Sequence, residues 1–316
     1  MRILCITPIL HIKGLKKNLE KIGEIDIFED PETKDIIGII HKYDAIFTNP
    51  NKSKVFLGKD LLKHAIKLKF ICTASTGTVH IDKDYLKKRK IKLISLTKEI
   101  KVLEKISSTS EHAFSLMLAS LRNIVEANRS VRNHRWDYEP FIGRQMNNLN
   151  ILVIGFGRLG KKFANYCKAF DSKVFVYDPY EKIPKDYIKV KELKEVLNKV
   201  NIISIHVHVN KSTKYLIDKK FFNDFLKDVL IINTSRGEII NEKDLISFLK
   251  KNKKAKISAD VLDEEIFGFK KSKLFKYSLK SDQVLLTPHI GGMTSDAQEI
   301  AYNHAAKLLM TAFENE

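Results

Sequence analysis

The sequence predicts an α/β protein built from two doubly wound parallel-sheet domains. Short runs rich in Ile, Val and Phe alternate with amphipathic segments along the chain, as expected for strands joined by crossover helices. With 316 residues, the chain is too long for one ordinary core and suits two domains. Hydrophobic residues make up 44% and charged residues 30%, which is typical of a globular protein that buries sizeable cores.

The first half of the chain carries a series of short, apolar, strand-like runs. Amphipathic helix-like segments, such as residues 58–69 and 80–90, separate them. The strands predicted in this half are residues 2–7, 25–30, 44–48, 69–74 and 92–96.

A long helical stretch follows, from about Ser107 to Arg135. It opens with a Ser or Thr cap ahead of Glu111 and continues with an apolar face, which is the signature of a helix N-terminus. The alternation of strands and helices then restarts, so a second α/β domain is expected. Its predicted strands are residues 150–156, 173–178, 201–207, 229–235, 256–262 and 283–288.

The chain is strongly basic, with a formal net charge of +18. Most of the basic residues are lysines spread along helices and mixed with acids, which favours a solvated surface over a polyanion site. No run combines basic residues with the aromatic spacing of an RNA-binding sheet, so the sequence argues against a nucleic-acid partner. The excess positive charge also suits a small anionic substrate.

Three cysteines, Cys5, Cys72 and Cys167, lie far apart, with no CxxC pair and no adjacent metal ligands. This sparse, odd set indicates a reducing cytoplasm and predicts no bound metal. The apolar start of the chain is short and broken by Pro8, which favours a strand over a signal peptide. No stretch approaches the roughly 18 apolar residues that a membrane span needs.

Three spaced glycines, Gly155, Gly157 and Gly160, follow an apolar run and open a helix-like segment. In that context glycine allows a sharp turn and lets a pyrophosphate approach the N–H groups of the helix N-terminus. The next strand ends at Asp178, close to the roughly 20-residue spacing of a ribose-binding carboxylate. Because a carboxylate repels a 2′-phosphate, we predict NAD as the cofactor rather than NADP. The alternative is a tight turn that binds nothing.

Four groups suited to chemistry come after strands of the second half: Arg236, Asp260, Glu265 and His289. Open α/β sheets bind ligands at the carboxyl ends of their strands, so we expect these side chains to converge. Singly, each has an ordinary explanation, such as a surface ion pair, a structural histidine or a solvated turn. Together, downstream of a dinucleotide loop, they predict a catalytic site.

The chain resembles the D-isomer-specific 2-hydroxyacid dehydrogenase family. The motifs that carry the resemblance are "STGTVHID" at 75–82, "SSTSEHAFSLMLASLR" at 107–122, the glycine loop, "NTSRGEIIN" at 233–241, "SADVLDEE" at 258–265 and "TPHIGG" at 287–292. The resemblance implies a flavodoxin-like substrate domain, residues 1–100 plus 291–316, and a Rossmann NAD-binding domain, residues 101–290. It also implies a homodimer that pairs through the NAD-binding domain, near residues 107–135.

By the resemblance, Arg236, Glu265 and His289 are catalytic, and Asp260 faces the nicotinamide ring. The implied reaction interconverts a 2-keto acid and a D-2-hydroxy acid. Its chemistry suits these side chains, because Arg236 can hold the substrate carboxylate through paired hydrogen bonds. His289 can act as general acid, and as general base in the reverse direction, since imidazole titrates near neutral pH. Glu265 would fix the tautomer of His289 and favour the imidazolium.

The resemblance also carries other residues onto binding positions, while Glu111 is expected to support helix packing. The substrate positions are Ser75, Thr76, Gly77 and Arg236. The cofactor positions are Gly155, Gly157, Arg158, Leu159, Gly160, Asp178, His206, Val207, Thr234, Ser235, Arg236, Asp260, His289 and Gly291.

Four positions depart from the family pattern. His208 and Ile266 stand where relatives commonly carry proline, and His80 replaces a frequent asparagine. Asn49 lies where phosphoglycerate-using relatives tend to have arginine, which argues against a phosphorylated substrate. The side chain of the acid stays open. The alternative to an enzyme is an NAD(H)-sensing, corepressor-like protein on the same scaffold, which would not need all three catalytic groups.

Overall fold

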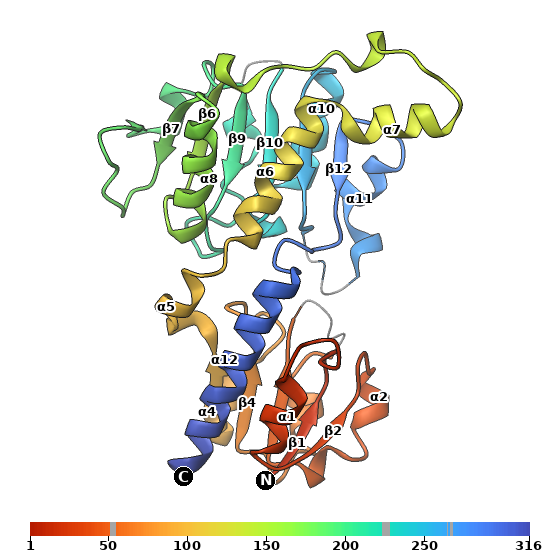
Figure 1. Cartoon of the computed structure of the whole chain (residues 1–316), viewed down its shortest axis with the longest axis vertical. Coiled ribbons are helices and arrows are strands. Elements are labelled where there is room, and N and C mark those ends of the chain that lie inside the picture. Colours follow the sequence, from red (N-terminus) through yellow and green to blue (C-terminus); the bar gives the residue numbers. More distant parts are fainter. Residues whose placement is uncertain (51–54, 223–227, 264, 266–267) are drawn as a thin grey trace. The chain divides into compact units, whose positions relative to one another are not determined.

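A computed structural model of the chain describes residues 1–50, 55–222, 228–263, 265 and 268–316. The chain divides into two compact units: Met1–Ile106 with Gly292–Glu316, and Ser107–Gly291. Over the described residues, each unit is built around its own parallel sheet (Figure 1). The α/β class with two doubly wound parallel sheets, predicted from the alternating pattern, is confirmed.

The first unit holds a five-stranded sheet in the order β2-β1-β3-β4-β5, which is the flavodoxin-like arrangement. Its strands are β1 (Arg2–Cys5), β2 (Glu24–Ile27), β3 (Ala45–Thr48), β4 (Phe70–Thr73) and β5 (Lys92–Ser95). Its helices are α1 (Leu15–Glu20), α2 (Thr33–Ile36), α3 (Lys59–Leu62), α4 (Lys83–Arg89), α5 (Ile100–Leu103) and α12 (Ser295–Glu314).

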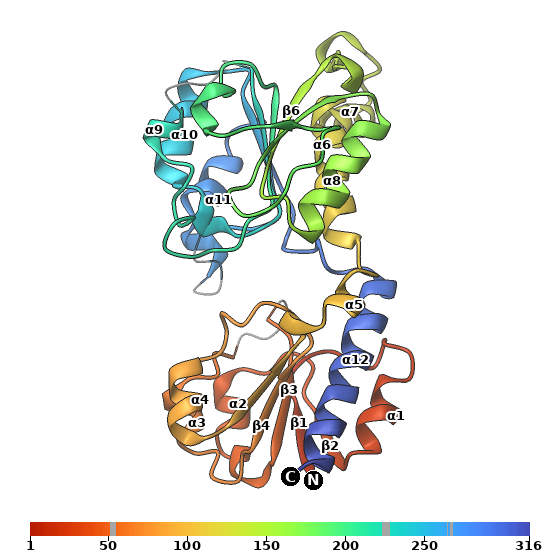
Figure 2. The ribbon, with the colours of Figure 1, turned by 90° about the vertical axis from the view of Figure 1, so that its left-hand side faces the viewer.

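Helices cover both faces of this sheet, and the strand sequences explain why. Successive strand side chains point to opposite faces, so Ile3 packs in the core beneath α1 and α12, while Leu4 packs in the core beneath α2 and α3. Figure 2 shows α1 and α12 together on one side of the sheet and α2, α3 and α4 on the other. Strands buried on both faces are mostly apolar, as in β3, where Ala45, Ile46 and Phe47 are buried ahead of the buried Thr48.

The second unit holds a seven-stranded sheet in the order β12-β11-β10-β9-β6-β7-β8. Its strands are β6 (Asn150–Ile154), β7 (Lys173–Tyr177), β8 (Ile188–Lys189), β9 (Ile202–Ile205), β10 (Leu230–Asn233), β11 (Lys256–Ala259) and β12 (Val284–Leu286). Its helices are α6 (Ser108–Leu121), α7 (Ile124–Arg132), α8 (Arg158–Ala169), α9 (Lys219–Phe222), α10 (Glu242–Lys251) and α11 (Lys273–Ser278). The strand order reverses between β6 and β9, which is where doubly wound sheets bind their ligands.

Two cores sandwich this second sheet. Met117 of α6 and Phe163 of α8 pack on one face, and Leu245 and Phe248 of α10 pack on the other. Figure 2 shows α6 and α8 on one side of the sheet, with α9, α10 and α11 opposite. Both faces of the sheet are therefore buried, so a ligand would bind at its carboxyl edge.

The long helix expected from Ser107 to Arg135 is interrupted, which corrects that prediction. Helix α6 ends at Leu121, and α7 begins at Ile124. Between them Asn123 adopts a left-handed conformation (φ 51°), which asparagine tolerates better than most residues. Its side chain accepts a 2.6 Å hydrogen bond from Lys256 Nζ, a residue far along the chain.

The three cysteines are unpaired and buried. Burial raises the pKa of the Cys5 thiol to about 12, so the thiol stays protonated. Among the described residues, no helix is long and apolar enough to cross a membrane, and no cluster of histidine, cysteine and acidic side chains could hold a metal ion.

Candidate active site

The catalytic residues selected from the sequence, and most of the cofactor residues, gather along the carboxyl edge of the second sheet. Parallel strands end at the same edge, so the groups that follow them become neighbours. The groups and their strands are Gly155 after β6, Asp178 after β7, His206 after β9, Thr234 to Arg236 after β10, Asp260 after β11 and His289 after β12.

The glycine loop shows why each glycine is needed. Gly155 has φ +94°, and a Cβ there would lie 2.5 Å from the His206 carbonyl oxygen. A Cβ on Gly160 would lie 2.0 Å from the Gly155 carbonyl oxygen. A Cβ on Gly157, the residue before α8, would meet nothing within 4 Å. The first and third glycines thus serve the fold itself, whereas Gly157 keeps open the space where a pyrophosphate would approach the helix.

Asp178 ties the glycine loop to the turn after β7. Its Oδ2 accepts a 2.7 Å bond from the Phe156 amide, and its Oδ1 accepts bonds from the amides of Tyr180 and Glu181 at 2.8 and 3.1 Å. A carboxylate offers roughly four acceptor positions, so three amides leave room for a ribose hydroxyl. Arg158 and Leu159 lie in the first turn of α8, where the Leu159 carbonyl accepts a 3.0 Å bond from Ser110 of α6.

The loop after β9 lines the other side of the glycine turn. His206 shares a 2.8 Å hydrogen bond with Ser204, and its ring packs 5.0 Å from that of Phe163. Burial lowers the pKa of His206 to about 3, which keeps the ring neutral. Val207 Cγ1 lies 2.8 Å from where a Gly155 Cβ would be. His206 and Val207 therefore shape the glycine loop, while His208 is exposed to solvent.

The turn after β10 is folded by an asparagine that sequence reasoning did not select. Asn233 accepts a 3.0 Å bond from the Ser235 amide and donates a 2.9 Å bond to the Arg236 carbonyl. Ser235 in turn donates to the Ile205 carbonyl at 2.6 Å. Thr234 Oγ1 is buried and has no hydrogen-bond partner among the described residues, so this edge offers an unused polar group to a ligand.

Arg236 is half-buried at the end of this turn. Its Nη1 donates a 2.6 Å hydrogen bond to the Ser235 carbonyl. The next residue, Gly237, is in such close contact with the turn after β11 that an added Cβ would lie 1.9 Å from the Leu262 carbonyl carbon. The turn that carries Arg236 thus abuts the segment that leads to Glu265.

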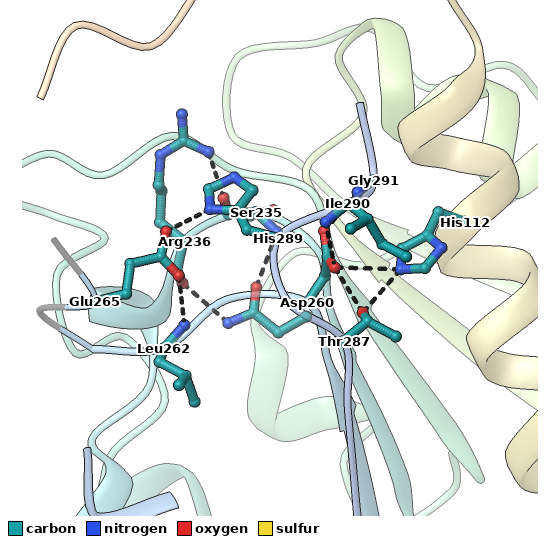
Figure 3. Close-up of polar contacts among 11 residues, drawn as sticks. His112, Ser235, Arg236, Asp260, Leu262, Glu265, Thr287, His289, Ile290 and Gly291 are labelled. Atoms are coloured by element: carbon teal, nitrogen blue, oxygen red, sulfur yellow. Dashed lines mark hydrogen bonds and ion pairs between the residues drawn. The ribbon is translucent and has the colours of Figure 1, made fainter. Parts of the chain in front are cut away.

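His289 and Glu265 form a direct hydrogen-bonded pair, Nδ1 to Oε1 (Figure 3). The other carboxylate oxygen of Glu265 accepts a 3.1 Å bond from the Leu262 amide. The side chains of His289 and Glu265 are 27% and 25% exposed. The pair is therefore mostly surrounded by protein, but a ligand can still reach it. His289 has φ 55°, a left-handed conformation that non-glycine residues seldom adopt and that often marks functional sites.

Asp260 anchors the backbone that follows His289. The carboxylate is 1% exposed and accepts four hydrogen bonds. Its donors are Thr287 Oγ1 at 2.5 Å, His112 Nε2 at 3.3 Å, and the amides of Ile290 and Gly291 at 2.8 and 2.7 Å. Burial by itself raises the pKa of the Asp260 carboxyl, but these bonds outweigh it and hold the pKa below its usual value.

His112 and Thr287 are further site residues that the sequence did not single out. Their side chains share a 2.9 Å hydrogen bond, and both reach Asp260 (Figure 3). The available signals were indirect: His112 follows Glu111 in the helix-start motif, and Thr287 lies two residues before His289.

Ser75, Thr76 and Gly77 belong to the first unit, directly after β4. Ser75 Oγ donates a 2.7 Å bond to the Gly77 carbonyl, which closes the turn. Asn49, also in this unit, donates a 3.1 Å bond to the Ala74 carbonyl. Ile266, where relatives carry proline, lies outside the described residues.

The edge of the second sheet combines a glycine loop with Asp178, a carboxylate that can still accept a hydrogen bond from a ribose hydroxyl. The His289–Glu265 pair lies on the same edge. These features are typical of a dinucleotide-binding α/β protein. The chain belongs to the D-isomer specific 2-hydroxyacid dehydrogenase family, whose NAD binding domain matches residues 114–291. This confirms the resemblance found in the motifs and the prediction of NAD as the cofactor.

Relatives span nearly the whole chain. D-3-phosphoglycerate dehydrogenase of Archaeoglobus fulgidus is 31% identical over 94% of this chain and 54% of the relative. Glyoxylate reductase of Thermococcus litoralis is 31% identical over 98% of this chain and 93% of the relative. The chain thus spans about half the length of the phosphoglycerate dehydrogenases that it matches.

A solved structure shares the fold at lower sequence identity. D-lactate dehydrogenase from Aquifex aeolicus, in complex with NAD and lactic acid, superposes with a TM-score of 0.82 at 24% identity, covering 100% of this chain and 96% of the other. At this identity the match supports the architecture only.

Proposed function

We propose that the chain is an NAD-dependent oxidoreductase that interconverts a 2-keto acid and a D-2-hydroxy acid. The observation that carries the proposal is the hydrogen-bonded pair of His289 and Glu265 on the same sheet edge as Arg236 and the glycine loop. A keto acid needs a cation for its carboxylate and a proton for its carbonyl oxygen, and these side chains supply both.

In the reduction, Arg236 binds the substrate carboxylate and so orients the neighbouring carbonyl. Glu265 accepts a hydrogen bond from the Nδ1–H group of His289, which leaves Nε2 to exchange a proton with the substrate. His289 then donates its proton to the carbonyl oxygen, and in the oxidation it takes the proton back from the hydroxyl. Bound NADH supplies the hydride for the carbonyl carbon.

The residues of the glycine loop fit NAD. Gly157 leaves open the space before α8, and Asp178 keeps acceptor capacity beside its three amide bonds. The Asp178 carboxylate would repel a 2′-phosphate, which supports NADH over NADPH. The buried hydroxyl of Thr234, which has no partner in the described part of the chain, is a candidate contact for the nicotinamide end.

The test measures oxidation of NADH against glyoxylate, hydroxypyruvate, phosphohydroxypyruvate, pyruvate and bulkier 2-keto acids, with NADPH in parallel. We expect one acid to be turned over with NADH and the activity to drop at least about 100-fold in His289→Ala. NADH binding, followed by fluorescence, should persist in that variant. An NAD(H)-sensing regulator instead predicts tight NADH binding, no turnover of any acid, and no effect of the substitution.

An unphosphorylated acid is the substrate class we favour. Asn49 is a neutral amide, and its Nδ2 donates to the Ala74 carbonyl. It therefore offers a phosphate neither the positive charge nor the bidentate fork of an arginine. Ser75, Thr76 and Gly77 remain predicted substrate positions. Phosphohydroxypyruvate turning over faster than the other acids would contradict this preference.

We further propose a cytoplasmic homodimer. The segment that follows α6 exposes an unusual set of large apolar side chains in one stretch of chain. These are Ile124, Val131, Trp136, Tyr138 and Ile142, of which Trp136 is 91% exposed. Exposed aromatic and aliphatic side chains of this size are typical of protein–protein interfaces. The unpaired cysteines suit a reducing compartment.

A further inference from the structure

A second buried carboxylate, Glu242, accepts hydrogen bonds from residues that lie on both sides of Glu265 in the sequence. It is the first residue of α10 and is 7% exposed. Its Oε1 accepts bonds from the Asp263 amide at 3.2 Å and the Ser272 hydroxyl at 2.7 Å. Its Oε2 accepts bonds from the amides of Lys273 and Leu274 at 2.7 and 3.1 Å. These four donors match the roughly four acceptor positions of a carboxylate, so the buried charge is fully used.

These contacts are not needed to start helix α10. Asn241 already caps that helix, because its side chain accepts bonds from the amides of Lys243 and Asp244 at 3.1 and 3.2 Å. Within the described part of the chain, no lysine or arginine forms an ion pair with Glu242. The carboxylate therefore serves the distant segment to which it bonds.

That segment carries Glu265. Asp263 precedes Glu265 by two residues, and Ser272 caps α11 on the other flank, where its hydroxyl accepts a 3.0 Å bond from the Phe275 amide. The Glu242 carboxylate thus bonds to the chain on both sides of Glu265. Glu265 itself accepts a hydrogen bond from the amide of Leu262, the residue before Asp263, and the Asp263 amide bonds to Glu242.

The segment that Glu242 holds also packs against the turn that carries Arg236. Gly237 packs so closely on the Leu262–Asp263 peptide that no side chain fits between them. Residues 236–242 therefore begin with Arg236, the proposed substrate-binding cation, and end with Glu242. A shift of Asp263 would move Glu265 and would press on the turn that holds Arg236.

We propose that Glu242 is a positioning residue that sets the placement of Glu265, and through it the orientation of His289. The inference rests on the proposed function, since it assigns a role within that site. Its contribution is geometric: the hydrogen bond between Glu265 and His289 forms only if the segment is held at Asp263 and at the start of α11.

The test compares Glu242→Gln, Glu265→Gln and the double variant in the full-length protein. The side-chain amide introduced by Glu242→Gln would turn N–H donors toward backbone N–H groups and release one flank of the segment. We expect kcat/KM to fall about 10- to 100-fold in Glu242→Gln, as for a misplaced catalytic group. NADH affinity should stay within about twofold. If Glu242 acts through Glu265, the double variant stays within about twofold of Glu265→Gln.

A spectroscopic measurement keeps the inference independent of turnover. In ¹⁵N-histidine-labelled protein, the Nδ1 proton of His289 should give a downfield resonance, assigned by its loss in His289→Ala. We expect this resonance to be lost in Glu265→Gln and in Glu242→Gln. If no acid is turned over by the wild type, the proposed function fails while the resonance still decides the role of Glu242.

Asp244→Asn is the matched control, because it removes one negative charge from the same helical turn. Asp244 accepts a bond from the Lys219 amide and lies outside the contacts of the Glu265 segment. It should leave both kcat/KM and the resonance unchanged. Additive losses in the double variant, or a His289 resonance retained in Glu242→Gln, would overturn the inference. If Glu242→Gln does not fold, Glu242→Asp keeps the charge, and the same losses should appear in smaller measure.

Discussion

At the scale of single residues, the acids of the site divide by what they bind. Glu265 bonds to the ring of His289, whereas Asp178, Asp260 and Glu242 each accept at least one backbone amide from a segment far away in sequence. An ionised carboxylate gives stronger hydrogen bonds than a neutral group, so it holds a turn firmly at the carboxyl edge. Asp178, Asp260 and Glu242 thus hold turns in place, and the proposed proton exchange is assigned to His289 and Glu265.

The first residue prediction concerns Arg236. Replacing it with lysine keeps the charge but loses the planar fork that can hold a carboxylate through two bonds. We expect KM for the keto acid to rise about 10- to 100-fold, in line with the loss of a charge-assisted hydrogen bond, while NADH affinity is little changed. Steady-state kinetics with a separate NADH titration measures both. An unchanged KM would show that another group binds the carboxylate.

The second residue prediction concerns acid stability. His80 is buried, neither ring nitrogen has a partner among the described residues, and burial lowers its pKa to about 4. In the unfolded chain histidine titrates near 6.5, so from pH 6.5 down to 4 the unfolded state binds more protons. The free energy of unfolding should therefore decrease as the pH is lowered from 6.5 to 4. This group contributes at most about 1.4 kcal/mol per pH unit to that decrease.

Urea denaturation of the wild type and His80→Asn at several pH values tests this. The variant should lose stability less steeply between pH 6.5 and 4, although His206, with its pKa also lowered by burial, keeps some of the slope. Identical slopes in the two proteins would show that His80 does not couple folding to protons.

At the scale of elements, the strand–turn–helix of β6 and α8 separates the needs of the fold from those of the ligand. Gly155 and Gly160 are required because their neighbours leave no room for a side chain, whereas Gly157 borders open space. A sequence motif presents the three glycines as equivalent. Packing distinguishes them, and a pair of alanine substitutions can measure the difference.

Gly157→Ala should leave the thermal unfolding midpoint of the unliganded protein within about 2 °C of the wild type, because its Cβ touches no protein atom. Its NADH dissociation constant should rise at least about tenfold, since the methyl group occupies the space for the pyrophosphate. Gly160→Ala should lower both the midpoint and the affinity, because its Cβ would lie 2.0 Å from the Gly155 carbonyl oxygen. Equal loss of stability in the two variants would contradict this distinction.

At the scale of the whole molecule, each unit has its own sheet and its own cores on both faces of that sheet. The predicted substrate positions are divided between the units, with Ser75 to Gly77 in the first and Arg236 in the second, beside the glycine loop and the His289–Glu265 pair. The formal charge of +18 is carried mostly by lysines, and by itself it does not identify a partner.

The apolar segment after α6 gives the prediction at this scale. The wild type should sediment as a dimer, because the exposed tryptophan and its apolar neighbours need a covering surface. Trp136→Glu should sediment as a monomer with unchanged far-UV circular dichroism, since the side chain is 91% exposed within the chain and is not needed for its fold. Analytical ultracentrifugation distinguishes the two species. A monomeric wild type at micromolar concentration would contradict the homodimer.

Much of this architecture follows from local pattern. Apolar runs separated by amphipathic segments predicted both sheets, and the glycine spacing and the groups after β10, β11 and β12 predicted the site edge. These features can be predicted from the sequence because a strand or a helix N-terminus depends on residues close together in the chain. The break at Asn123 was missed because a left-handed asparagine inside a helical pattern leaves no periodic trace.

The sequence by itself determined the fold class and the family, and it predicted which side chains are reactive. Only the tertiary structure decided how those side chains are held: Glu242 on the segment of Glu265, Asp260 on the backbone after His289, and Gly237 against Leu262. Each of these contacts joins residues 20 or more positions apart, as from Glu242 to Asp263 (21 positions) or from Asp260 to Gly291 (31 positions). No local pattern encodes which distant amide a buried carboxylate will meet, because that is set by the packing of whole elements.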